Sequence, residues 1–103
     1  MEQTFGDTIR AWRKQRGEPL RVVAAAVEID STLLSKIERG ERLPTRTQLV
    51  KFAEYFNVPL DELAAQVIAD KIVLDFGEHQ GATLQALNIV RERISPYRTE
   101  GIE

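Results

Sequence analysis

The side chains best suited to chemistry in this sequence are hydroxyls and cations between residues 31 and 46. Ser31 and Thr32 carry hydroxyl groups that can donate hydrogen bonds to base edges or accept them. Lys36, about one helical turn further on, could reach guanine acceptors or a phosphate, and Leu33 could contact a thymine methyl group. The chemistry that this segment favours is therefore hydrogen bonding to polar edges, with neutralisation of phosphate charge.

Four arginines, three of them within this segment and one before it, are candidates for phosphate contacts, which hold register and supply salt-dependent affinity. They are Arg21, Arg39, Arg42 and Arg46. Residues 1–55 hold ten basic and eight acidic side chains, whereas residues 56–103 hold four basic and eight acidic ones. The whole chain has a net charge of −2, so nucleic-acid binding requires the basic groups to share one face. A solvated surface of mixed charge is the alternative interpretation.

The elements that must position these side chains are short helices, which the apolar spacing predicts throughout residues 4–70. The third predicted helix, residues 31–39, follows the good N-cap Asp30 and stops at Gly40. It turns Leu34 and Ile37 inward, so the polar candidates and Leu33 face outward. At about 13 Å long it suits a major groove about 12 Å wide.

Four more helices complete the predicted N-terminal domain. The first carries an apolar face and the second runs from about residue 20 to 27. A capping box at Thr45 and Gln48 opens the fourth, Asn57 ends it, and Pro59 opens the fifth. The apolar face of the first helix consists of Phe5, Ile9 and Trp12.

Residues 71–103 form a predicted appendage to a domain of residues 1–70. Residues 71–76 fit either a helix or a strand, because their apolar side chains also alternate. A last helix is predicted over residues 82–94, with Ser95 and Pro96 ending it. These segments carry apolar faces that a five-helix domain cannot bury, which predicts a symmetric dimer; the alternative is that they fold back on their own subunit. The dimerisation candidates are Val67, Ile72, Leu74, Leu84, Leu87, Val90 and Ile94.

The sequence strongly resembles the Xre or lambda-repressor-like family of helix-turn-helix DNA-binding domains over about residues 5–68. The matching segments are Trp12-Arg13, Val23-Ala24, Leu34-Ser35-Lys36-Ile37-Glu38-Arg39-Gly40, Pro44 and Phe56-Asn57-Val58-Pro59-Leu60-Asp61-Glu62-Leu63. The resemblance implies an all-α fold, a five-helix DNA-binding domain with a helical dimerisation appendage. It also implies that base-reading residues lie at the start of the third helix, and that Arg13 and Glu38 pair across the first and third helices as a structural ion pair.

Three positions depart from the family pattern. Glu28 stands where the turn usually has glycine, so either this residue takes a positive φ or the turn differs slightly. Leu20 replaces the Gln that binds a phosphate in relatives, so either that phosphate has no ligand here or Arg21 binds it instead. Pro19 replaces the usual Thr or Ser N-cap and offers no capping oxygen.

These features predict a dimeric, sequence-specific regulator that binds a palindromic operator in double-stranded DNA, as a repressor of its own operon. By resemblance, that operon could belong to a restriction-modification or phage-defence system. The alternative is an antitoxin-like or peptidase-controlled DNA-binding protein that binds a protein partner through residues 70–103.

Other functional classes find little support. The absence of cysteine excludes a disulfide scaffold and thiolate metal sites. His79, the only histidine, has no ligand partner at suitable spacing, and no nucleophile motif or phosphate loop is present, so we expect no metal, cofactor or catalysis. No apolar run approaches the length of a membrane span. We expect a cytoplasmic, nucleoid-associated protein.

Overall fold

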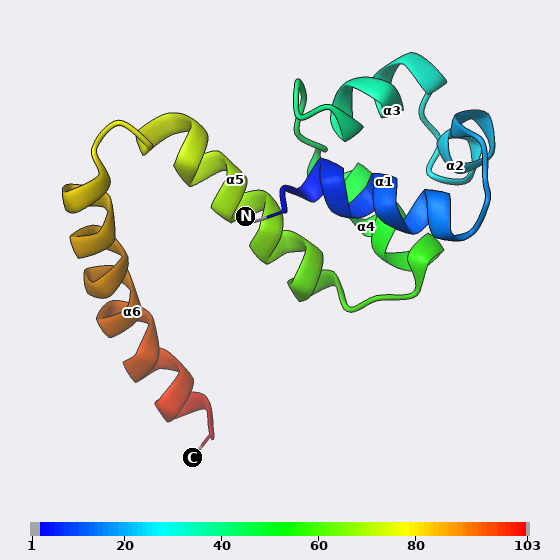
Figure 1. Ribbon diagram of the computed structural model, residues 1–103. Coiled ribbons are helices and arrows are strands. Elements are labelled where there is room, and N and C mark those ends of the chain that lie inside the picture. The colour runs from blue at the N-terminus through cyan, green and yellow to red at the C-terminus, as the bar shows by residue number, and fades with distance from the viewer. Residues whose placement is uncertain (1–2, 103) are drawn as a thin grey trace. The chain divides into compact units, whose positions relative to one another are not determined.

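The computed structural model describes residues 3–102, with side chains described as far as Ser95 (Figure 1). This range contains six helices and no strand, which confirms the predicted all-α fold. The segment 71–76, which the sequence left open between helix and strand, is helical. The helices are α1 (Phe5–Gln15), α2 (Leu20–Ala26), α3 (Ser31–Glu38), α4 (Arg46–Phe56), α5 (Leu60–Phe76) and α6 (Gln80–Ile102).

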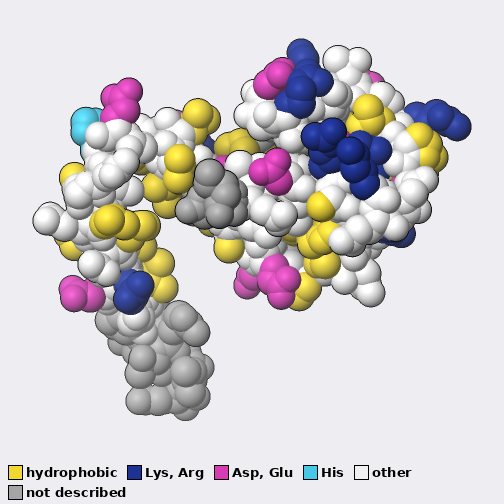
Figure 2. Space-filling view, viewed as in Figure 1, with side chains coloured by type: hydrophobic (Ala, Val, Ile, Leu, Met, Phe, Trp, Pro, Cys, Tyr) yellow, Lys and Arg dark blue, Asp and Glu magenta, His cyan; other side chains and the backbone are white. Residues whose placement is uncertain are grey.

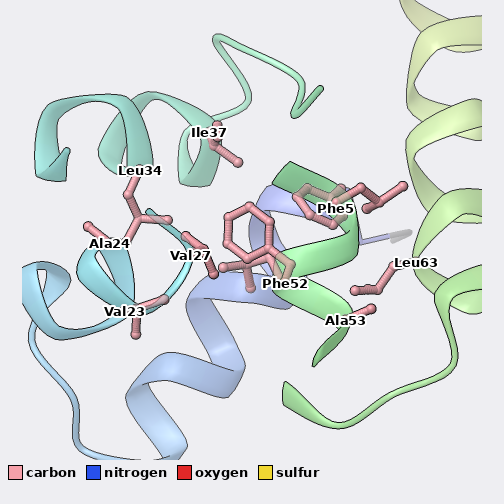
Figure 3. Close-up of a cluster of buried hydrophobic side chains, with 11 residues drawn as sticks. Phe5, Val23, Ala24, Val27, Leu34, Ile37, Phe52, Ala53 and Leu63 are labelled. Carbon is pink, nitrogen blue, oxygen red and sulfur yellow. The ribbon is translucent and has the colours of Figure 1, made fainter. Parts of the chain in front are cut away.

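The chain divides into two compact units, residues 1–71 and 72–103, and α5 runs through the boundary between them. The first unit has a continuous core to which α1 to α4 and the start of α5 each contribute buried side chains (Figure 3). Phe5 and Phe52 meet edge to face with ring centroids 5.5 Å apart. The inward positions that helical spacing predicts for α3, Leu34 and Ile37, are buried.

Side-chain oxygens cap the start of three helices. Asp30 accepts a 2.7 Å hydrogen bond from the backbone N–H of Leu33, which confirms its predicted role at the start of α3. The predicted capping box of Thr45 and Gln48 opens α4. A second capping box, at Thr4, opens α1. By contrast, α2 begins at Pro19 without a side-chain cap, as the sequence predicts.

The first four helices end in the same way: one residue takes the left-handed conformation, and its N–H and the N–H of the next residue donate hydrogen bonds to carbonyls of the helix. Glycine fills this position after α1 and α3, but Glu28 fills it after α2 with φ +63°. Of the two possibilities for Glu28, the structure thus has the positive φ, a conformation that costs energy in a residue other than glycine. The left-handed residues are Gly17, Glu28, Gly40 and Asn57.

The predicted end of the last helix is wrong. Helix α6 extends over Gln80–Ile102 instead of stopping at Ser95 and Pro96. A proline within a helix removes one N–H donor, which leaves the carbonyl four residues earlier without its usual partner. The hydroxyl of Ser95 hydrogen bonds to the Arg91 carbonyl at 2.8 Å, one residue before that position. Pro96 therefore weakens one turn of α6 but does not end the helix.

Candidate nucleic-acid interface

Helices α2 and α3 are joined by a four-residue turn, Val27 to Asp30, and pack against each other. The face of α3 that points into the core contains Leu34, Ile37 and Glu38, all of which are buried. The opposite face therefore lies at the surface of the first unit. This arrangement leaves the start of α3 and the turn that follows α3 accessible to a large ligand.

The four predicted base-contacting residues do not share one environment. Thr32 is exposed, while Ser31 and Lys36 are half-buried on the outer side of α3. Leu33 is partly buried and packs against the hydrophobic core. Three of these side chains therefore lie on one surface of α3, whereas the side chain of Leu33 mostly contacts the core.

The four predicted phosphate-contacting arginines are all exposed. Arg21 lies in the first turn of α2, Arg39 directly follows α3, Arg42 lies in the loop after it, and Arg46 begins α4. On the face shown in Figure 2, most Lys and Arg side chains belong to the first unit and few belong to the α6 segment. On this face, therefore, most of the cationic side chains belong to the unit that contains α3.

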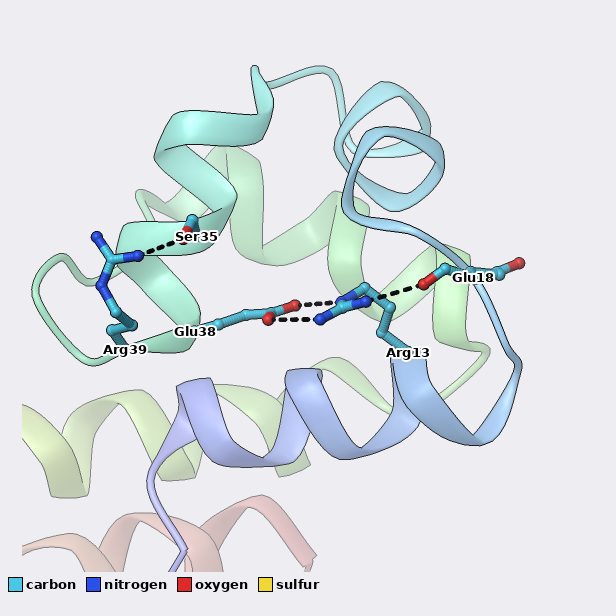
Figure 4. A network of polar contacts seen from close by, with 5 residues as sticks. All are labelled: Arg13, Glu18, Ser35, Glu38 and Arg39. Carbon is cyan, nitrogen blue, oxygen red and sulfur yellow. Dashed lines mark hydrogen bonds and ion pairs between the residues drawn. The ribbon is translucent and has the colours of Figure 1, made fainter.

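Arg39 is engaged by its own chain. Its Nε donates to Glu41 Oε2 at 2.8 Å and its Nη2 donates to Glu41 Oε1 at 3.3 Å. Its Nη1 donates to Ser35 Oγ, the one of these contacts that Figure 4 draws. The hydrogen bonds with Glu41 raise the pKa of Arg39 and lower the pKa of the Glu41 carboxyl. The positive charge of Lys36 also favours the ionised form of Glu41. Both members of the pair are therefore charged at neutral pH.

Arg13 and Glu38 lie together, as the family resemblance implies. Arg13 Nε donates to Glu38 Oε2 at 2.8 Å and its Nη2 donates to Glu38 Oε1 at 3.1 Å, while its Nη1 donates to the carbonyl of Glu18 at 2.9 Å (Figure 4). The side chains of Arg13 and Glu38 are only 13% and 5% exposed. The hydrogen bond with Glu38 raises the pKa of Arg13. This pair fixes α3 on α1, so it supports the outer face of α3 from behind.

Gly6 lets α1 approach the end of α3 more closely than any other residue would. A Cβ atom at this position would lie 2.2 Å from the carbonyl oxygen of Ile37 and 2.7 Å from that of Glu38. Both neighbours are backbone atoms, which cannot move aside without displacing α3. No periodic signal in the sequence identifies this glycine, because the close approach joins residues more than thirty positions apart.

Three further positioning contacts were not predicted. Asp70 on α5 accepts a 2.8 Å hydrogen bond from the backbone N–H of Phe5, at the start of α1. Lys51 Nζ lies 3.2 Å from Glu28 Oε2 and joins α4 to the turn before α3. The third is the contact between Arg39 and Glu41. Their separation of two residues is only a weak indication, in the sequence, that the two side chains meet.

The predicted dimerisation residues are mostly exposed. None of the residues 72–95 is buried. An open apolar groove of about 400 Å³ runs along this unit, lined by Ile72, Phe76, His79, Ala82, Thr83, Ala86, Leu87 and Val90. Leu74, Leu84 and Ile94 are also exposed. Val67 differs from the rest of the predicted set, because it packs against the core of the first unit.

The part of the chain that the structure describes has neither a metal-binding cluster nor a membrane-spanning helix. No group of three or more His, Cys, Asp or Glu side chains there could hold a metal ion. In the same range, no helix has the length and apolar character that crossing a membrane requires.

Two short helices joined by a tight turn, with a polar and basic outer face on the second, define a helix-turn-helix DNA-binding domain. The chain belongs to the helix-turn-helix domain family, whose model matches residues 4–66. It is 39% identical over 62 residues to the uncharacterized HTH-type transcriptional regulator YazB of Bacillus subtilis (strain 168). That match covers 60% of this chain and 90% of YazB.

The fold is also similar to the crystal structure of the clp gene regulator ClgR from Corynebacterium glutamicum. The TM-score is 0.54 at 20% sequence identity, and the match covers 86% of this chain and 88% of that one. This likeness concerns the fold alone. The family match and the similarity to YazB identify an Xre-like helix-turn-helix protein, a DNA-binding transcriptional regulator.

Proposed function

We propose that this protein is a dimeric repressor that binds a palindromic operator in the promoter of its own operon. The observation that carries the proposal is the outer face of α3, which presents Thr32, Ser31 and Lys36 while its inner face is buried. In helix-turn-helix proteins such a face enters the major groove, with its N-terminal residues against the base edges. Occupying a promoter in this way would block transcription of the genes that follow.

Within this proposal, Ser31, Thr32 and Lys36 read bases, and the exposed arginines bind the DNA backbone. Leu33 makes at most a limited contact with a thymine methyl group, because its side chain packs on the core. Arg21, Arg42 and Arg46 lie on three different elements around α3, so their phosphate contacts would fix the register of α3 in the groove.

A second copy of the chain is the occupant that we propose for the apolar groove of residues 72–95. None of the described residues 72–95 of this unit is buried, so this part of the chain buries too little apolar surface to stabilise itself in water. Its exposed side chains include Leu84, Leu87, Val90 and Ile94 along α6. A dimer paired through these faces would carry two α3 helices, as a palindromic operator with half-sites about 34 Å apart or a multiple of that distance requires.

Nuclease footprinting on the DNA upstream of the gene, across a salt series, tests operator binding. We expect a protected inverted repeat. Lys36→Ala should lower affinity for that site by about 1–3 kcal/mol and relax specificity if Lys36 reads a base. A similar loss on every sequence, with a salt slope smaller by about one unit, would assign Lys36 to a phosphate. Lys14→Ala, on the exposed side of α1, is the charge-matched control.

Sedimentation equilibrium tests the dimer. Leu87→Asp should shift the protein toward the monomer, whereas Val22→Asp on α2 should not, although both side chains are 40% exposed. A wild-type protein that is monomeric throughout the micromolar range would overturn the dimer. A heterologous protein partner for residues 70–103, as in the antitoxin-like alternative, would then be the next hypothesis.

A further inference from the structure

The turn that ends α3 holds Glu41 in a fixed place. Gly40 has φ +80°, its N–H donates to the carbonyl of Ile37 at 3.1 Å, and the N–H of Glu41 donates to the carbonyl of Lys36 at 2.9 Å. This pair of bonds is the Schellman closure of a helix, which leaves little freedom to the backbone at Glu41. The carboxylate therefore stands beside the guanidinium of Arg39 because of the way in which α3 ends.

The ion pair between Arg39 and Glu41 has little to contribute to the stability of the fold. Its members are two residues apart in sequence, and their side chains are 53% and 52% exposed. Exposed pairs of this kind add between nothing and about 1 kcal/mol. The pair of Arg13 and Glu38, by contrast, joins two helices and is nearly buried. What the exposed pair does change is which groups of Arg39 are available to a ligand.

A carboxylate and a phosphate present the same two-oxygen edge to a guanidinium group. Glu41 already fills this edge of Arg39 with hydrogen bonds of 2.8 and 3.3 Å, directly beside the outer face of α3. A DNA phosphate could bind Arg39 there only by displacing the carboxylate, which would then remain close to the negatively charged backbone.

We propose that Glu41 is an intramolecular competitor of DNA phosphate at Arg39, and that it lowers the affinity of the protein for duplex DNA of every sequence. This inference rests on the proposed function, because it requires that α3 docks on DNA. The competition acts on backbone binding through Arg39, which is not one of the side chains proposed to read bases. Release of the protein from DNA that lacks the operator is thereby favoured.

Fluorescence anisotropy with a labelled duplex of mixed sequence, titrated at several salt concentrations, tests this proposal. Glu41→Gln keeps the size of the side chain but removes its charge. We expect affinity to rise about two- to fivefold at low salt, which is the range that an exposed ion pair can supply. The plot of log affinity against log salt concentration should become steeper by about one unit, because Arg39 gains a phosphate. Glu41→Ala should give the same result.

Two controls separate competition from a general effect of charge. Glu54→Gln, on the exposed side of α4, changes the net charge by the same amount and should leave affinity nearly unchanged. In an Arg39→Gln background, the gain from Glu41→Gln should disappear. A gain that persists in that background, or an equal gain from Glu54→Gln, would overturn the competition.

The wild-type titration distinguishes failure of this inference from failure of the proposed function. If the wild-type protein binds the duplex and Glu41→Gln changes neither affinity nor salt slope, the competition is wrong and the proposed function stands. If neither protein binds this duplex or the promoter fragment at any salt concentration, the proposed function fails and the competition fails with it.

Discussion

Replacing Arg13 with alanine should lower the free energy of unfolding by about 3–5 kcal/mol. The carboxylate of Glu38 has a side chain that is only 5% exposed, and the substitution would leave its charge buried without its cation. The substitution also removes both hydrogen bonds between the two side chains, at 2.8 and 3.1 Å. The loss of stability arises because the buried carboxylate of Glu38 is left without a cation, and it exceeds the contribution of the intact pair to the free energy of unfolding.

The two halves of the pair should not be equivalent. Glu38→Ala should cost less, about 1–3 kcal/mol, because Arg13 keeps its hydrogen bond to the carbonyl of Glu18. The guanidinium is also 13% exposed, so its charge can reach water. Replacing both side chains together, as Arg13→Met with Glu38→Leu, should recover most of the stability, because an apolar pair leaves no buried charge.

Urea denaturation followed by the fluorescence of Trp12, the only tryptophan, measures these differences. Trp12 is partly buried and its ring lies 5.3 Å from that of Phe56, so unfolding changes its surroundings. With a denaturant slope of about 1–3 kcal/mol/M, a loss of about 3 kcal/mol moves the midpoint by roughly 1–3 M. All variants must be compared at one protein concentration, because dimerisation would stabilise the folded state. If Arg13→Ala costs less than about 1 kcal/mol, the pair behaves as a surface ion pair and our account of α3 positioning is wrong.

Other consequences of the structure concern single positions. Gly6→Ala should destabilise the protein by about 1–3 kcal/mol or more, because the new Cβ would meet backbone oxygens of α3; an unchanged thermal melt would contradict this packing. Glu28→Gly should raise the free energy of unfolding by about 0.5–1 kcal/mol, since relief at φ +63° outweighs the loss of an exposed ion pair; a drop in the urea midpoint would show the opposite balance. The hydrogen bond to Glu18, together with burial and the charge of that carboxylate, raises the pKa of Tyr55. The stabilising bond is therefore complete below the ordinary tyrosine pKa of about 10 and disappears as the pH rises through the raised value. Tyr97, the other tyrosine of the sequence, is first replaced by phenylalanine so that the phenolate absorbance reports Tyr55 alone. In this background the absorbance should appear at lower pH once Glu18→Gln is added; identical titrations would refute the coupling.

The sequence identifies most of the local structure. Apolar spacing predicts the helices of the first unit because a helix must place one stripe of side chains in the core. Asp30, Thr45 and Gln48 predict helix starts because their side chains bond to N–H groups only a few residues away. The end of α6 could not be predicted in this way, because a proline lowers the stability of a helix without dictating where it stops.

By itself, then, the sequence determined the helix-turn-helix motif, the polar outer face of α3 and the family to which the chain belongs. Only the tertiary structure decided that Leu33 packs on the core, that Gly6 lies against the backbone of α3 and that Asp70 caps the start of α1. It also decided that Glu41 occupies the guanidinium of Arg39. The physical reason is range: caps and periodicity act over a few residues, whereas packing and ion pairing depend on which elements meet in space.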